Sequence, residues 1–452
     1  MANKHRLVAL LAVLSLVATA CSNGASPSPS AATSAAASST APVSAPVSAP
    51  VSASAAPSPS AEAVTSYPRA ETLYTSGKQY GAPSTWNPLD PNAAMGTVGL
   101  QYETLFLYDP QKDEFKPWLA ESASWTSPTE YTIKVRQGVK WSDGQAFTAD
   151  DVAFTIGLAK IKALGSNIWD YVTDATATDA STVVVKFNNP AYQEWATWTY
   201  NSPILPKHIW TSLANEDILK TTNANGVGTG PYMYKTHADD RMVWVKNDNW
   251  WAKTALNLDV KPKYIVDIVN GANSVALGMV LQGGLDLSNN FLPGIGELVN
   301  RGYVKTYYPA APYMLSANTA WLVTNDKKAP TSDPQFRKAI ATAINVGQIV
   351  SNAYANIVAP ANPTGLLPSW AKYVDKAIVA DLGTKYDVAK AKSILAAAGY
   401  KAGAGGFVTN KDGSPIKLTI SVPTGWSDWE AARDIIITSL KAAGINVESK
   451  PL

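Results

Sequence analysis

The sequence contains little cysteine, little histidine, little net charge and no apolar run long enough to cross a membrane. Cys21 is the only cysteine among 452 residues, so the chain cannot form an internal disulfide. Three histidines are present, and no group of His, Cys and Asp has the spacing of metal ligands, which disfavours a zinc or nickel site. A net charge of +2 creates no long-range field and argues against a nucleic acid partner.

Catalytic and cofactor-binding patterns are also missing. No nucleophile elbow or oxyanion loop is visible. Gly228-Thr229-Gly230 is not a phosphate loop, because Pro231 stands where such a loop enters a helix. Asp150 and Asp151 are adjacent acids at an expected helix start, where carboxylates cap the helix. We therefore expect a protein that is not an enzyme and that holds no cofactor and no metal.

Tryptophan and tyrosine are abundant, with fifteen and twenty residues against eight phenylalanines. Such rings pair an apolar face with a polar group and suit surfaces that meet sugar rings or peptide side chains. Packing in the core is the alternative for each of them. Because 452 residues are too many for one core, we expect two or more domains.

The N-terminus has the pattern of an export signal. Lys4, His5 and Arg6 precede Leu7–Val17, an apolar run of eleven residues that is too short to span a bilayer. The following residues, 18–21 (ATAC), resemble a lipobox, although Ala18 replaces the preferred leucine. We predict a signal peptide over 1–20 and lipid attachment at Cys21, with several acyl chains giving a stable anchor. Cleavage by an ordinary signal peptidase after Ala20 is the alternative.

A tether is expected after Cys21. Residues 22–66 are almost entirely Ser, Ala, Pro, Val and Thr, with a repeated APVS, and offer too little apolar surface to offset the entropy of ordering. At roughly 3 Å per residue in polyproline conformation, this segment reaches on the order of 100 Å. Such a reach suits a protein anchored to the outer face of a cell membrane beneath a wall.

The most informative stretch lies between residues 117 and 156. Residues 131–136 alternate apolar and polar side chains, which predicts a half-buried strand. A turn follows over 141–144, with Gly144 free to take positive φ. Thr148 stands three residues before Asp151, the spacing of a helix N-cap and a carboxylate near the positive end of the helix dipole.

These segments, LAESASW and VRQGVKWSDGQAFTADDVAFT, resemble the signature of solute-binding proteins of ABC importers, family 5, which bind oligopeptides, dipeptides, some oligosaccharides and nickel complexes. Further ordered matches are the segments at 204–209 (ILPKHI), 228–232 (GTGPY), 247–251 (NDNWW), 275–286, 322–344 and 386–395. The resemblance implies an α/β fold of the two-lobe periplasmic-binding type II, with mixed sheets, flanking helices and an extra subdomain in the first lobe.

The resemblance also sets the expected domains. We assign 67–311 to the first lobe, with the inserted subdomain at about 100–195, and 312–452 to the second lobe. Apolar positions at Phe336, Ile340 and Ala343 predict a buried helix face, and a strand at 416–422 precedes a helix at 428–443. Relatives continue for on the order of a hundred residues beyond this point, including the acidic residue that grips a peptide amino group, so we expect an incomplete second lobe.

The resemblance implies a monomer whose lobes close over a small ligand and present it to a membrane permease. The segments at 86–89 (WNPL) and 425–429 (GWSDW) resemble the corresponding segments of cellobiose-binding members of the family. We predict ligand contacts from six residues: Trp86, Asn87, Trp195, Trp198, Trp426 and Trp429. The expected function is capture of oligopeptides or short oligosaccharides at the extracellular face of the cell membrane. The alternatives are a Trp-rich secreted glycoside hydrolase and a cell-wall adhesin lipoprotein.

Overall fold

The computed structural model describes residues 67–76, 81–110, 112–161, 164, 166–314 and 319–452. All of them belong to one unit, Ser60–Leu452. The predicted signal peptide, Cys21 and the tether lie outside the described residues. No helix of the described part is long and apolar enough to cross a membrane.

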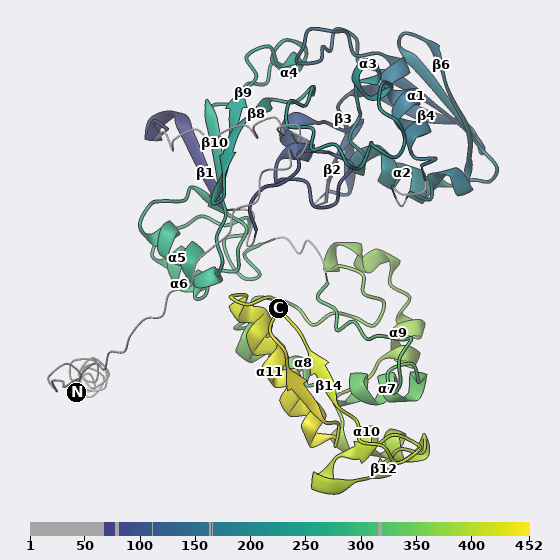
Figure 1. Ribbon diagram of the computed structural model, residues 1–452, viewed down its shortest axis with the longest axis vertical. Helices are drawn as coiled ribbons and strands as arrows, with labels where there is room; N and C mark the ends of the chain where they lie inside the picture. Colours follow the sequence, from purple (N-terminus) through teal and green to yellow (C-terminus); the bar gives the residue numbers. More distant parts are fainter. Residues whose placement is uncertain (1–66, 77–80, 111, 162–163, 165, 315–318) are drawn as a thin grey trace, which may run out of the picture. The chain divides into compact units, whose positions relative to one another are not determined.

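A five-stranded mixed sheet has the strand order β11-β1-β10-β9-β8 (Figure 1). Strand β1 pairs in parallel with β10 and β11, whereas β9 pairs antiparallel with both β10 and β8. The prediction of mixed sheets is therefore confirmed. The bounds are β1 (Thr72–Ser76), β8 (Tyr232–Ala238), β9 (Arg241–Lys246), β10 (Tyr264–Ile268) and β11 (Leu287–Ser288).

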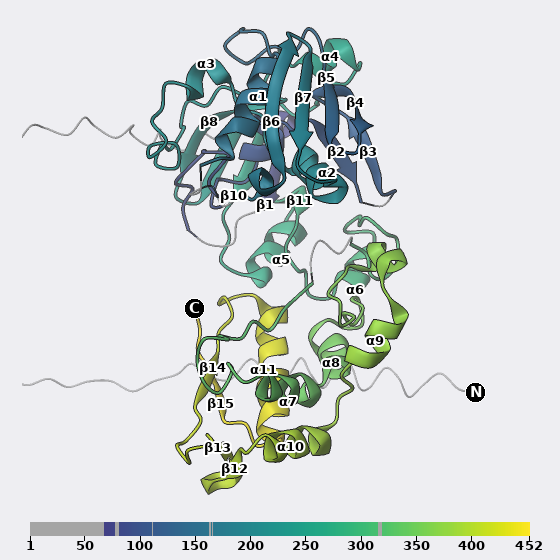
Figure 2. The same cartoon turned by 90° about the vertical axis from the view of Figure 1, so that its right-hand side faces the viewer.

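A second sheet is antiparallel throughout, in the order β4-β5-β7-β6, and the helix α1 packs against β6 and β7 (Figure 2). The strand predicted at 131–136 is its β5. The bounds are β4 (Ala120–Ser127), β5 (Glu130–Val135), α1 (Ala149–Leu158), β6 (Val172–Asp179) and β7 (Thr182–Phe187), with a separate hairpin of β2 (Phe106–Asp109) and β3 (Glu114–Pro117).

The predicted turn and helix start are confirmed in detail. Gly144 has φ 90°, and α1 begins immediately after Thr148. One carboxylate oxygen of Asp151 accepts from the backbone N–H of Thr148 at 2.9 Å, and the other accepts from the backbone N–H of Lys207 at 2.8 Å. Asp151 therefore links the start of α1 to the backbone at Lys207.

The GTGPY segment needs its glycines because the backbone of residues 100 and 101 lies directly against it. A Cβ at Gly228 would lie 2.0 Å from the carbonyl oxygen of Gln101, and one at Gly230 would lie 2.1 Å from that of Leu100. The N–H of Gly230 donates to the Gln101 carbonyl at 2.9 Å. Any side chain at these two positions would push the chain segments apart, so the motif is explained by packing.

The first large core contains a buried carboxylate inside a group of tryptophans. Glu103 is 3% exposed and accepts hydrogen bonds from three indoles: Trp118 Nε1 at 2.9 Å, Trp250 Nε1 at 3.1 Å and Trp251 Nε1 at 2.7 Å. Trp250 and Trp251 lie in the same core as the buried faces of α1, β5 and β7. Burial raises the pKa of Glu103 to about 7, and the hydrogen bonds led by Trp251 lower it only in part.

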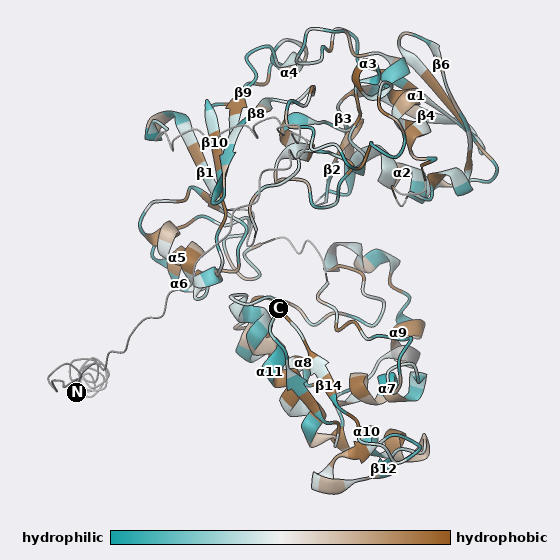
Figure 3. Ribbon diagram, viewed as in Figure 1, coloured by the Kyte–Doolittle hydropathy of each residue, from teal (hydrophilic) through white to brown (hydrophobic). Residues whose placement is uncertain are grey.

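A separate core lies between residues 336 and 447. Its buried side chains include Phe336, Ile340 and Ala343, as the periodicity predicted. Helices α7 (Pro334–Ala343), α10 (Val388–Ala397) and α11 (Ser427–Ala442) enclose it with the parallel strands β14 (Leu418–Ile420) and β15 (Val447–Ser449). Figure 3 shows hydrophilic and hydrophobic residues alternating along α11. Strand β14 is shorter than the strand predicted at 416–422. The assignment of 67–311 and 312–452 to two lobes stays a prediction.

The remaining elements are short. They are η1 (Arg69–Glu71), η2 (Thr97–Gln101), η4 (Ile168–Asp170), α2 (Tyr192–Asn201), α3 (Lys207–Trp210), α4 (Trp251–Ala255), α5 (Asn273–Leu281), α6 (Ile295–Asn300), α8 (Val346–Gln348), η5 (Ile349–Ala353), η6 (Pro368–Tyr373), α9 (Lys376–Leu382), β12 (Lys401–Ala402), η7 (Ala404–Gly406) and β13 (Val408–Thr409).

The buried carboxylate predicts a pH-dependent stability. The ordinary pKa of a glutamate is 4.5, and in the folded chain the pKa of Glu103 is about 7. Between these two pH values, Glu103 keeps a proton in the folded chain that it loses on unfolding. The stability is therefore highest at low pH in this window and falls as the pH rises, by on the order of 3 kcal/mol in total. Glu103→Gln should flatten this dependence in urea unfolding followed by tryptophan fluorescence. Glu121→Gln, an exposed position on β4, is the matched control; an unchanged slope in Glu103→Gln would contradict the assignment.

Candidate functional site

The tryptophan surplus is mainly a property of the core. Eight of the fifteen tryptophans are buried. They are Trp86, Trp141, Trp195, Trp198, Trp210, Trp244, Trp250 and Trp251. The abundance of this residue type is therefore not by itself a sign of a ligand surface.

Trp86 and Asn87 lie in this buried set. Trp86 is 4% exposed, donates from Nε1 to the sulfur of Met242 at 3.1 Å, and packs its ring against Tyr234 and His237. Asn87 is fully buried; its amide donates to the carbonyl of Ile218 at 2.6 Å. Neither residue presents a surface to solvent in this structure. Their assignment to a ligand site stays a prediction that burial does not support.

Trp195 and Trp198 are three apart on α2 and stack on each other, with ring centroids 5.0 Å apart and planes 9° apart. Trp195 is covered almost completely. Trp198 is 9% exposed and lines a pocket of about 560 Å³. The two predicted residues therefore differ in their surroundings: Trp195 lies in the core, whereas Trp198 lines the pocket.

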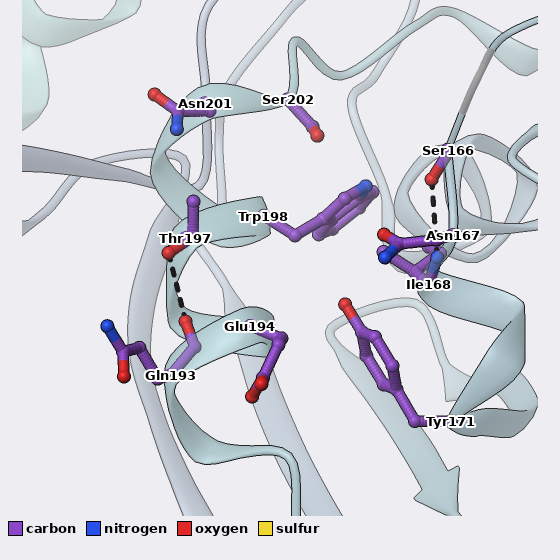
Figure 4. A pocket seen from close by; sticks show the side chains of 10 residues that line it. All are labelled: Ser166, Asn167, Ile168, Tyr171, Gln193, Glu194, Thr197, Trp198, Asn201 and Ser202. Carbon is purple, nitrogen blue, oxygen red and sulfur yellow. Dashed lines mark hydrogen bonds between the residues drawn. The ribbon is translucent and has the colours of Figure 1, made fainter. Parts of the chain in front are cut away.

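The pocket lies between the η4 turn and α2 (Figure 4). Its wall combines two aromatic rings, one carboxylate, three amide side chains and several hydroxyls. The lining residues are Ser166, Asn167, Ile168, Tyr171, Gln193, Glu194, Thr197, Trp198, Asn201 and Ser202. Sequence reasoning missed Tyr171 and Glu194, because neither stands in a motif; only the fold brings η4 beside α2.

Trp426 and Trp429 form the second aromatic group. Both are half-buried, their ring centroids are 5.2 Å apart, and their planes are nearly perpendicular at 89°. Trp426 immediately precedes α11, and Trp429 lies in its first turn. Of the six predicted ligand residues, these two are the least buried, and their assignment to a ligand site stays a prediction.

The loop that carries this pair is held by Asn273, the first residue of α5. Asn273 is 1% exposed; its backbone N–H donates to the carbonyl of Gly425 at 3.0 Å and its amide donates to Asp428 Oδ1 at 2.9 Å. Gly425 has φ 86°, and a Cβ there would lie 2.2 Å from the carbonyl oxygen of Gly271, so only glycine fits. Burial raises the pKa of Asp428, with hydrogen bonds opposing it. No sequence motif pointed to Asn273.

Metal binding finds no geometric support in the described part of the chain, where no group of three or more His, Cys, Asp or Glu side chains is placed to hold an ion. His208, one of the histidines, is instead in contact with Asp143 at 2.7 Å.

Comparisons with known proteins agree on one family. The sequence model of the bacterial extracellular solute-binding proteins, family 5 Middle, matches residues 114–452. Among solved structures, the chain is similar to the periplasmic oligopeptide-binding protein of an oligopeptide ABC transporter from Thermotoga maritima, solved with bound mannohexaose. The identity is 45% and the TM-score 0.82, over 85% of this chain and 73% of that one.

Two curated relatives are more distant. A protein named as an ABC transporter-binding protein from Deinococcus radiodurans is 24% identical over 76% of this chain and 62% of its own length. One named as an ABC transporter peptide-binding protein from Brucella ovis is 25% identical over 71% of this chain and 59% of its own length. The chain thus spans about three fifths of the length of these relatives.

The burial of the aromatic residues gives a direct test. Trp86→Ala should lower the free energy of unfolding by about 3–5 kcal/mol, because it empties a packed core position. Trp429→Ala, at a half-buried position, should cost about 1 kcal/mol. Urea denaturation midpoints measure both. Equal losses for the two variants would contradict the division between core and surface tryptophans.

Proposed function

Because the chain belongs to family 5 of the bacterial extracellular solute-binding proteins, we propose that it is the lipid-anchored substrate-binding component of an ABC importer and that it captures short oligosaccharides. Proteins of this family are transport binding proteins rather than enzymes. The glycoside hydrolase alternative therefore loses its basis. The partner is a membrane permease that receives the ligand, and the protein acts as a monomer at the extracellular face of the membrane.

The observation that carries the ligand class is the Trp426–Trp429 pair. Indole rings stack on the apolar faces of pyranose rings and leave the sugar hydroxyls to polar partners. The two half-buried rings stand at a right angle, so one can lie under a sugar while the other closes its edge. The 45% identity to a protein solved with mannohexaose supports the same class.

Oligopeptides are the second candidate ligand. The Thermotoga protein is itself named as oligopeptide-binding, and the Brucella relative is named as peptide-binding. A peptide would need a charged partner for its amino group. The two indoles of the pair offer apolar area, and the Asp428 carboxylate between them in sequence is buried and bonded to Asn273, which favours a neutral ligand.

Calorimetry and tryptophan fluorescence of the full chain distinguish these ligands. We expect saturable binding of mannohexaose or cellopentaose, weakened at least about tenfold by Trp426→Ala or Trp429→Ala. Trp321→Ala is the matched control, since Trp321 is 63% exposed and outside the pair. Tight binding of pentaalanine without any response to the sugars would assign an oligopeptide instead. No affinity for either class would favour the adhesin alternative.

The anchor has its own test. Cys21 lies outside the described residues, and the proposal rests on the lipobox-like sequence at 18–21. Cys21→Ser removes the thiol that would carry the diacylglycerol, so the protein should be released into the medium or stay unprocessed. Detergent phase partitioning measures this. A Cys21→Ser chain that partitions with the membrane as fully as the unaltered one would refute lipid attachment.

A further inference from the structure

The pocket between η4 and α2 contains two hydrogen-bond donors that the protein itself does not use. Tyr171 and Trp198 both line the pocket, and neither the Tyr171 hydroxyl nor the Trp198 indole N–H hydrogen-bonds to another described residue. In Figure 4 the Tyr171 hydroxyl points toward the centre of the group, and the drawn hydrogen bonds join only Ser166 to Ile168 and Thr197 to Gln193. Both donors are therefore available to a ligand.

The two rings that carry these donors are held firmly. Tyr171 stacks on Phe187 with planes 7° apart, and Trp198 stacks on Trp195 with planes 9° apart. Phe187 ends β7 and Trp195 is a core residue, so both stacks are fixed by the four-stranded sheet and its core. A ligand that binds here meets donors whose positions are already set, which lowers the entropic cost of binding.

The acceptor side of the pocket is a carboxylate. Glu194 is exposed, lines the same pocket, and has no ion-pair partner among the described residues. Burial, with smaller effects from the charges of Glu194 and Asp170, raises the pKa of Tyr171 to about 12, so the phenol keeps its proton and remains a donor at neutral pH. The described residues of the lining include no Lys, Arg or His.

This combination selects a chemical class. An indole N–H can only donate and an ionised carboxylate can only accept, so a ligand that meets both must offer an acceptor and a donor. A carboxylate or phosphate ligand would be repelled by Glu194 and would find no cation among the described residues of the lining. An ammonium ion would satisfy Glu194 but offers no acceptor to Trp198 or Tyr171. A hydroxyl group donates and accepts at a single oxygen, whereas an amide divides the two roles between separate atoms.

We propose that the pocket lined by Tyr171, Glu194 and Trp198 is a second binding site, separate from the Trp426–Trp429 pair, and that it takes a neutral sugar ring through its hydroxyls. The amides of Asn167, Gln193 and Asn201 supply further paired donors and acceptors around the rim. A volume of about 560 Å³ lies within the range of small-molecule sites. This site does not depend on the ligand proposed for the Trp426–Trp429 pair.

The test uses the indole N–H signal of Trp198 in the full chain labelled with ¹⁵N-tryptophan, assigned from the spectrum of Trp198→Phe. Methyl α-mannoside and methyl β-glucoside are the probes, because single sugar rings are small enough for the pocket. At least one should shift the Trp198 signal saturably, with a dissociation constant on the order of 1 mM. Saturation-transfer NMR on the glycoside provides a second readout that needs no assignment.

Tyr171→Phe and Glu194→Gln should each weaken this binding at least about tenfold, and Glu121→Gln should not change it. The proposal is overturned if neither glycoside gives a saturable response with the folded chain, or if the response is the same in Tyr171→Phe and Glu194→Gln. A saturable response to n-butylamine in place of the glycosides would overturn the assigned ligand class. The signals of Trp426 and Trp429 report the other site separately, so failure at one site is not failure at the other.

Discussion

The Glu103 carboxylate is the constraint on which the larger core depends. A carboxylate with its surface removed from water is costly unless its oxygens are bonded, and here three indole N–H groups meet it. Those indoles come from two places in the chain, Trp118 beside β3 and the consecutive pair Trp250 and Trp251 at α4. One acidic residue thereby fixes how segments more than a hundred residues apart approach each other.

This arrangement also explains why the chain uses tryptophan where many proteins use phenylalanine. A phenylalanine at these positions would fill the core but leave the carboxylate without donors, and a buried acceptor left unbonded costs about 1–3 kcal/mol or more. Indole supplies both apolar bulk and an N–H. The compositional surplus therefore reflects, in part, a requirement of packing around a polar centre, and only some of the tryptophans remain for contact with ligands.

The fold was largely predictable because its signals are local. The alternation at 131–136 is visible in six residues, the helix start at Thr148 in four, and the buried stripe of α7 in a single helix. The site was less predictable. Trp86 and Trp426 look alike in sequence, each in a turn-rich segment, yet Met242 and Tyr234 cover the first while the second is only half-buried. Which tryptophan is covered depends on strands far away in the sequence. The same holds for Tyr171, Glu194 and Asn273, whose neighbours come from other elements.

The loop from Pro423 to Trp429 divides its positions by role. Gly425 and Asp428 are tied to Asn273 and to the backbone at Gly271, and neither can be exchanged without breaking a close contact or a buried hydrogen bond. Trp426 and Trp429 are half-buried positions of the same loop. A new side chain at Trp426 or Trp429 would therefore alter the surface of the loop, whereas one at Gly425 or Asp428 would disrupt the loop itself. The backbone of this loop and the surface that it carries can thus change independently of each other.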